Sequence, residues 1–121
     1  MSILNFMSVY EIEHYNFIRA RNIRFNLENM SHALFFVYSL SNAKLMKILI
    51  NRGADVNLHN VNKETMLMMS CQNSDHIKIS KLLIDHGADL DLQNNDGQTA
   101  LMYACIYKNV EIVSYILEHL E

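Results

Sequence analysis

The chain has 121 residues, of which 50% are hydrophobic and 19% are charged, so one folded domain with a substantial core is expected and a disordered chain is excluded. The net charge of −3 is too small to favour nucleic acid or a membrane surface as a partner. Three glycines, no proline and two cysteines exclude glycine-rich phosphate loops, Pro-rich linkers and a disulfide scaffold.

The N-terminal residues show no targeting signal. Residues 1–10 contain no basic side chain, and Glu11 and Glu13 follow directly. The longest apolar stretch, Ala33–Tyr38, is far shorter than the ~20 residues that a membrane span needs. We therefore expect no membrane contact and a cytoplasmic location. Abundant Asn, Ile and Met without Pro or Trp are typical of AT-rich genomes, and for a virus or an intracellular microbe that location would be the host cytoplasm.

Internal repetition begins weakly in the first quarter of the chain and strengthens toward its end. Arg52–Leu58 recurs as His86–Leu92, and Thr65–Cys71 recurs as Thr99–Cys105, both at the same spacing. Lys81–His86 recurs as Ser114–His119, at a spacing shorter by one position. The repeated unit is therefore about 33 residues long, and the longer spacing marks a single insertion near positions 73–75.

This period divides one domain, residues 1–121, into unequal parts. We expect a degenerate N-terminal cap at 1–26 and repeats at 27–59, 60–93 and 94–119, the last one truncated. In the first repeat, His32–Val37 takes the place of Thr99–Ala104. We interpret residues 120–121 as a remnant of cloning.

Each unit is predicted to be a pair of helices. Thr65 and Thr99 are suited to cap a first helix, which in the last unit runs to about Tyr107. The second helix of that unit, about residues 110–119, is expected to bury Ile112, Val113, Ile116 and Leu117. In the earlier units the second helix ends at Gly53 or Gly87, because glycine permits a left-handed turn. One unit cannot bury its own apolar face, but stacked units can.

These segments resemble the ankyrin repeat, and the best match is Gly87–Leu117, with Gly-Ala-Asp-Leu-Asp, Asp-Gly-Gln-Thr-Ala-Leu and Glu-Ile-Val at the family's spacing. The family's Pro is absent from every unit, and Lys63 and Met30 stand where the last unit has the turn glycine Gly97. The resemblance implies an all-α solenoid of stacked antiparallel helix pairs with projecting hairpin or loop fingers.

No arrangement of reactive side chains is predicted. His86 and His119 hold equivalent positions, which packed helices place ~10 Å apart, too far to share a metal ion. The same spacing prevents a disulfide between Cys71 and Cys105, which we expect to be small core residues. Residues 74–76, Ser-Asp-His, lie at a predicted turn. We therefore expect a protein that is not an enzyme and that has no catalytic residue, metal or cofactor.

The resemblance implies a module that binds another protein through a concave face of fingers and first helices, as a scaffold or adaptor. Tyr107 is the preferred anchor, because aromatic side chains are frequent hot spots. For any one candidate, simple exposure to solvent explains the residue equally well. The candidates are Glu28, Asn29, Ser31, Ser39, His59, Val61, Asn62, Glu64, Gln72, Asn73, Gln93, Asn95, Asp96, Gln98, Ile106 and Tyr107.

Other functions remain open at this level. The same fold would serve an inhibitor that occludes an enzyme such as a kinase. The basic cluster Arg19, Arg21 and Arg24 would suit nucleic acid, although a solvated cap fits it better. The last unit lacks a polar closing repeat, so the chain is either part of a longer array or able to self-associate through that end.

Overall fold

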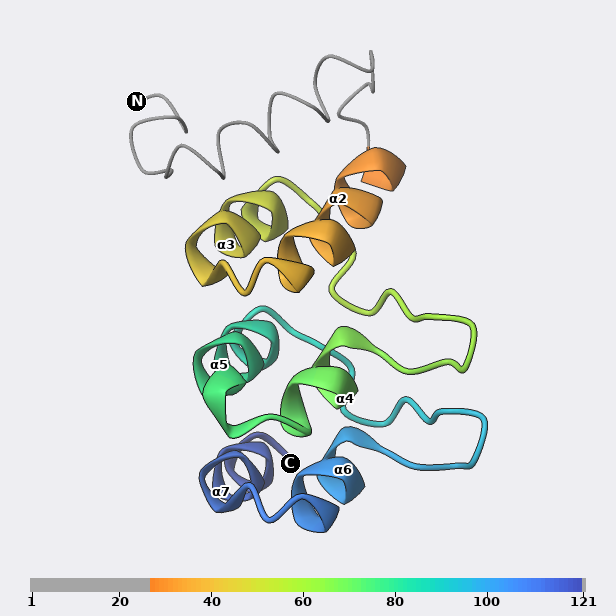
Figure 1. Ribbon diagram of the computed structural model, residues 1–121, viewed down its shortest axis with the longest axis vertical. Helices are drawn as coiled ribbons and strands as arrows, with labels where there is room; N and C mark the ends of the chain where they lie inside the picture. The colour runs from red at the N-terminus through yellow and green to blue at the C-terminus, as the bar shows by residue number, and fades with distance from the viewer. Residues whose placement is uncertain (1–26, 121) are drawn as a thin grey trace.

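The computed structural model describes residues 27–120, and residues 1–26 and 121 lie outside the description. The described residues form six α-helices and no strand, in three antiparallel pairs (Figure 1). The pairs are α2 (Leu27–Ser39) with α3 (Ala43–Asn51), α4 (Met66–Cys71) with α5 (Ile77–Asp85), and α6 (Ala100–Ile106) with α7 (Val110–His119). The all-α fold predicted from the repeats is confirmed. The predicted cap and its arginine cluster lie outside the described residues.

The first helices of the second and third pairs begin as the sequence predicts. The Thr65 hydroxyl accepts a hydrogen bond from the Met68 amide at 3.2 Å, and the Thr99 hydroxyl accepts one from the Met102 amide at 3.4 Å. Each bond satisfies a backbone donor that the helix itself leaves free. The inserted residue lies in a short 3₁₀ turn, η2 (Ser74–His76), between α4 and α5.

Glycine was expected in the turns that follow the second helices, and the backbone there has the left-handed conformation. Gly53 has φ 104° and Gly87 has φ 83°. At the finger tips Gly97 has φ 77°, and Lys63 adopts nearly the same conformation with φ 59°. The loss of glycine at position 63 therefore leaves the turn unchanged.

The first helix pair departs from the prediction at its start. Met30 was expected in a turn, but it lies inside α2 and is buried. Met30, Ala33, Leu34 and Val37 share one helical face, and burying that face against α3 favours helix over a turn. The predicted finger positions Glu28 and Asn29 are therefore helical in this pair.

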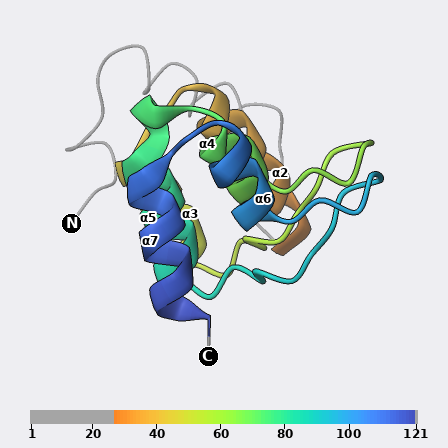
Figure 2. The same cartoon turned by 90° about the horizontal axis from the view of Figure 1, so that it is seen from below.

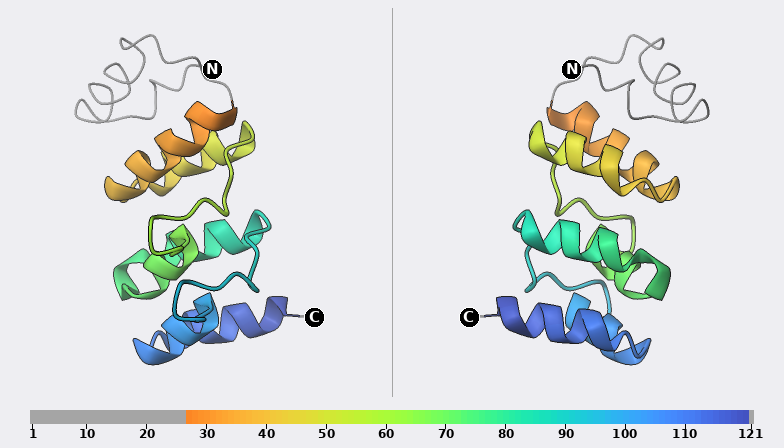
Figure 3. Two further views of the ribbon diagram at one scale, coloured as in Figure 1. Left: turned by 90° about the vertical axis from the view of Figure 1, so that its right-hand side faces the viewer. Right: turned by 90° about the vertical axis from the view of Figure 1, so that its left-hand side faces the viewer.

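The core runs through the stack between successive pairs. Figure 3 shows the pairs as successive layers, and α3 packs on α5, α4 on α6 and α5 on α7. Ser70 and Ala104 are fully buried, and such small side chains let the first helices approach closely. The Ser70 and Ser80 hydroxyls share a 2.7 Å hydrogen bond between α4 and α5, so this buried polar pair is satisfied.

The outer side of the third pair differs from the equivalent side of the second. Cys71 is fully buried, but Cys105 is exposed, so its prediction as a core residue is wrong. Leu117 is 54% exposed, whereas Ile84 at the equivalent position is 5% exposed. The predicted burial of Leu117 is also wrong, because no described element packs on that side of α6 and α7.

The two segments that join the pairs project to one side as fingers, at residues 52–65 and 86–99 (Figures 1 and 2). They lie beside the first helices α2, α4 and α6, while α3, α5 and α7 form the opposite layer. Fingers and first helices together make one face of the stack, which we call the concave face. Among residues 27–120, no helix combines the length and apolar character that crossing a bilayer requires.

Candidate functional site

Each finger is held in shape by one asparagine. The Asn60 side-chain oxygen accepts hydrogen bonds from the backbone amides of Asn62 at 2.9 Å and Glu64 at 3.0 Å. Asn94, at the equivalent position of the next finger, accepts the matching bonds from Asp96 and Gln98, both at 2.9 Å. Asn readily bonds backbone groups two residues ahead, so these loops are shaped by their own side chains.

The two fingers are also joined to each other. The Asn95 amide donates to the Asn62 carbonyl at 3.1 Å, and the Asp89 amide donates to the Asn57 side chain at 2.7 Å. The two fingers are therefore hydrogen-bonded to each other and together form one side, or wall, of the concave face.

Tyr103 of α6 connects this wall to the helices. Its hydroxyl donates to Glu64 Oε2 at 2.8 Å and accepts from Asn94 Nδ2 at 2.7 Å. Asn60 Nδ2 donates to the other carboxylate oxygen of Glu64 at 3.0 Å. The hydrogen bonds from Asn60 and Tyr103 lower the pKa of Glu64, so this carboxyl group is ionised at neutral pH.

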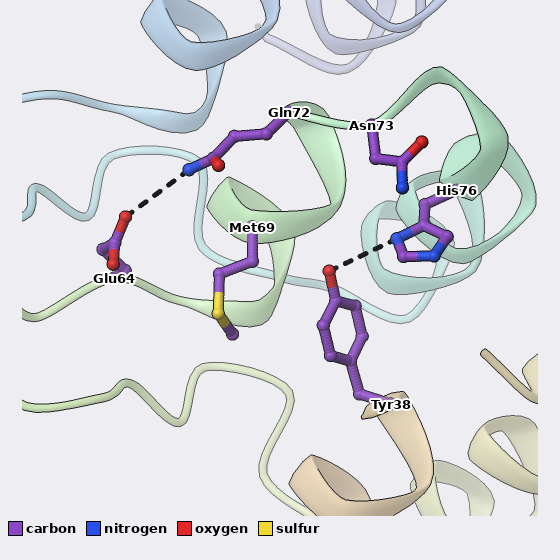
Figure 4. Close-up of a pocket in the computed structure, with 6 residues that line it drawn as sticks. All are labelled: Tyr38, Glu64, Met69, Gln72, Asn73 and His76. Atoms are coloured by element: carbon purple, nitrogen blue, oxygen red, sulfur yellow. Dashed lines mark hydrogen bonds between the residues drawn. The ribbon is translucent and has the colours of Figure 1, made fainter. Parts of the chain in front are cut away.

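A hollow of about 500 Å³ opens on the concave face between α2 and α4. We call it the α2–α4 hollow. In Figure 4, Glu64 and Gln72 lie at one end, joined by a 3.5 Å hydrogen bond, and the Met69 thioether lies between them and the far end. Its lining residues come from both helix pairs and are Tyr38, Glu64, Met69, Gln72, Asn73 and His76.

Tyr38 and His76 form the far end of this hollow. The Tyr38 hydroxyl lies 3.4 Å from His76 Nδ1, and the Ser41 hydroxyl lies 3.1 Å from His76 Nε2 (Figure 4 shows the first pair). The two rings meet edge to face with centroids 5.6 Å apart. Burial raises the pKa of Tyr38 to about 12, so its hydroxyl stays protonated and keeps a donor available.

A second hollow of about 410 Å³ lies between the fingers, and we call it the finger hollow. Its lining is almost entirely polar and includes Glu64, which therefore borders both hollows. The lining residues are Asn62, Glu64, Asn94, Asn95, Asp96, Gln98 and Tyr103.

Seven of the sixteen candidates line these hollows, and three more are exposed at the end of α6 or on a finger. Gln72 and Asn73 line the α2–α4 hollow, and Glu64 lines both. Ile106 and Tyr107, at the end of α6, are 58% and 53% exposed. Val61 projects from its finger and is 93% exposed. The others are those of the finger hollow: Asn62, Asn95, Asp96 and Gln98.

The remaining candidates lie elsewhere. Ser31 was predicted to contact a partner, but it is buried and accepts a hydrogen bond from the Asp55 amide at 2.8 Å, so it supports the turn after α3. Ser39 is exposed at the end of α2. His59 and Gln93 are exposed at the finger bases. Glu28 and Asn29 lie on α2, and their side chains lie outside the description.

Tyr38, Met69 and His76 line the α2–α4 hollow but were absent from the sequence-based candidates. Tyr103 and Asn94 were also missed, although they link the fingers to α6. The recurrence of Asn at 60 and 94, each with Glu or Gln four residues later, was the one pattern that could have identified the finger bonds.

His86, His119 and Cys71 are held by local hydrogen bonds or by burial. No group of three His, Cys, Asp or Glu side chains between residues 27 and 120 is placed to hold a metal ion. His86 and His119 each bond locally through Nδ1, to the Leu82 and Tyr115 carbonyls, both at 2.8 Å. Burial raises the pKa of the Cys71 thiol to about 12, so it is not a nucleophile at neutral pH.

Stacked helix pairs joined by braced fingers define a solenoid repeat protein. A family model of ankyrin repeats, in three copies, matches residues 34–121, so the chain belongs to the ankyrin repeat family. Ankyrin repeats are generally protein–protein interaction modules and are typically not enzymes. A search of curated proteins finds no match to this chain.

Proposed function

We propose that this protein is a non-enzymatic scaffold or adaptor that binds a segment of another protein along its concave face. The observation that carries the proposal is the placement of the two hollows, which share Glu64 and lie on one face of the stack. Ile106 and Tyr107 are exposed apolar side chains at the end of the first helix α6, and we include them in the proposed binding face.

The hydrogen bonds within the fingers and between the fingers and α6 support this function. Asn60 and Asn94 fix the loops, and Tyr103 ties them to the helices before any partner arrives. Binding to a preformed surface costs little ordering entropy, so more of the contact energy appears as affinity.

Affinity capture with a matched pair of variants tests the proposal. In the first variant, Tyr107→Ala and Gln72→Ala truncate two side chains on the concave face. In the control, Val110→Ala and Leu117→Ala truncate two exposed side chains of α7, on the opposite layer. We expect a protein that is retained by wild type and by the control but lost from the first variant. Equal retention by all three would contradict the proposed face.

Two other functions make different predictions. An inhibitor would reduce the activity of a captured enzyme in proportion to its concentration, whereas a scaffold would not. Nucleic-acid binding through Arg19, Arg21 and Arg24, outside the described residues, would weaken as salt rises, because phosphate contacts release counterions. Affinity for RNA or DNA that is independent of salt would reject that function.

The outer side of the third pair is proposed as a surface for self-association. Met102 and Leu117 are 47% and 54% exposed there, although their equivalents in the second pair are buried. We expect light scattering to show a mass that rises with concentration, and Met102→Lys with Leu117→Lys to abolish the rise. A constant monomer mass for the wild type would remove this proposal.

A reducing, cytoplasmic location is part of the proposal. Its support is that both cysteines of the chain are free, Cys71 buried and Cys105 exposed.

A further inference from the structure

The charge of Glu64 has no counterpart in the described part of the chain. The ion pairs there are Lys81 with Glu111 and His119 with Asp85, and neither involves Glu64. Lys63 is its neighbour in sequence, but the Lys63 side chain is exposed at the finger tip and forms no ion pair with it. Glu64 is thus an ionised carboxylate, held by neutral hydrogen bonds, that borders both hollows of the concave face.

The finger itself does not need this charge. Gln98 occupies the equivalent position of the next finger, where its side-chain oxygen accepts from Asn94 Nδ2 at 3.0 Å. Glu64 accepts the same bond from Asn60 Nδ2. A neutral amide can therefore accept the bond that shapes the loop, so the negative charge at position 64 is not required for that bond.

The α2–α4 hollow beside Glu64 is shaped for a long side chain with a polar end. The Met69 thioether lies between the Glu64 end and the Tyr38–His76 end (Figure 4). Gln72 holds Glu64 through a long bond of 3.5 Å, so its amide is readily released to a ligand. A Lys or Arg side chain places an aliphatic stem on apolar surface and keeps its charge at the rim.

We propose that the concave face recognises a Lys or Arg side chain of its partner segment, with the stem over Met69 and the charged end at Glu64. This inference rests on the proposed function and names the chemistry of the partner. Asp96, across the finger hollow, adds a second negative charge, and no Lys or Arg lines either hollow. The face as described is therefore complementary to a basic segment and repels an acidic one.

Selection from a displayed library of random short peptides tests the inference. The wild type is compared with Glu64→Gln, which copies the residue of the neighbouring finger, and with Glu118→Gln, which removes the same charge from the exposed side of α7. Selected peptides should carry Lys or Arg at one fixed position. Their affinity should fall about tenfold with Glu64→Gln and stay unchanged with Glu118→Gln.

A measurement on the unaltered protein guards against a folding defect in Glu64→Gln. Raising the salt concentration should weaken binding of the selected peptides to the wild type, because salt screens a charge pair that is open to solvent. Replacing the fixed basic residue of the peptide by Gln should remove that salt dependence.

The outcomes separate the inference from the function on which it rests. If the selected peptides lose affinity for the Met69→Lys and Tyr107→Ala variants but share no basic residue, the inference is wrong and the proposed function stands. Selection that yields no peptide sensitive to Met69→Lys or Tyr107→Ala would contradict the proposed function itself.

Discussion

The junction between the first and second helix pairs differs from the junction between the second and third. At the second junction, α4 lies along α6 and α5 along α7, and Lys81 Nζ contacts Glu111 at 2.7 Å. Asp85 and Tyr115 form a further hydrogen bond across it. At the first junction, α3 lies along α5, but α2 approaches α4 at few points.

The two junctions differ in side-chain size at one repeat position. α2 carries Tyr38 where α4 carries Cys71 and α6 carries Cys105. The buried Cys71 leaves room for α6, whereas the Tyr38 ring stands at the edge of the α2–α4 hollow. The two junctions thus differ in side-chain size at this position, and the hollow lies at the junction that has the larger residue.

The largest expected effect comes from a residue that serves both junctions. Leu83 is fully buried on α5, which packs on α3 and on α7. Leu83→Ala should lower the free energy of unfolding by about 2–5 kcal/mol, because it leaves a cavity that cannot collapse fully. Urea unfolding followed by circular dichroism measures this, and a loss below about 1 kcal/mol would show that the assigned buried face is wrong.

A second prediction places a tyrosine, the residue at position 38 of the first junction, at the equivalent position 71 of the second junction. Cys71→Tyr should lower the free energy of unfolding by about 1–3 kcal/mol, because the ring must displace α6. The control is Cys105→Tyr at the equivalent exposed position, with an expected change within about 0.5 kcal/mol. Equal losses in thermal unfolding would mean that close approach of α4 and α6 is unimportant.

A third prediction compares the two tyrosine hydroxyls. Tyr103→Phe should cost about 1–2 kcal/mol, because the hydroxyl bonds both a charged carboxylate and Asn94. Tyr38→Phe should cost less than about 1 kcal/mol, since its bond to His76 is 3.4 Å long. The reverse order in chemical denaturation would contradict a tighter second junction.

The smallest effect is a pH dependence at Glu64. Hydrogen bonds lower the pKa of Glu64 from 4.5 in the folded state, so its stabilising contribution is present above pH 4.5 and is lost as pH falls through the lower, folded pKa. The difference in unfolding temperature between wild type and Glu64→Gln should therefore shrink with acidification below pH 4.5. A difference that stays constant would show that the charge does not strengthen these bonds.

Local chemistry was predictable from the sequence. Thr65 and Thr99 cap their helices, and Gly53 and Gly87 take the left-handed turns, because these bonds and dihedral angles depend on a few adjacent residues. The stacked all-α fold followed from the repeat period, because only stacking buries the repeated apolar positions.

Features that depend on the neighbouring unit were not predictable. Cys71 and Cys105 are the same residue at the same repeat position, yet one is buried and the other exposed. The reason is that α6 packs on the outer side of α4, whereas no described helix packs on the outer side of α6. Ser31 was predicted as a contact residue for a related reason. Its hydroxyl accepts a hydrogen bond from the Asp55 amide, in the turn after the following helix, and local sequence does not show this bond. Tyr38 and His76 lie far apart in the chain, in different units, so repeat alignment gave no reason to bring them together.

The bonds that shape each finger come from within that finger, and this decides which finger residues can be replaced. Asn60 and Asn94 shape each loop through backbone amides, while side chains such as Val61 extend into solvent. Replacing the residues at positions 61, 62, 95 and 96 would alter what the surface recognises while leaving the loops' supporting bonds in place. A diversified collection built on these four positions would keep one scaffold throughout, so new specificities could be selected without repacking the interior.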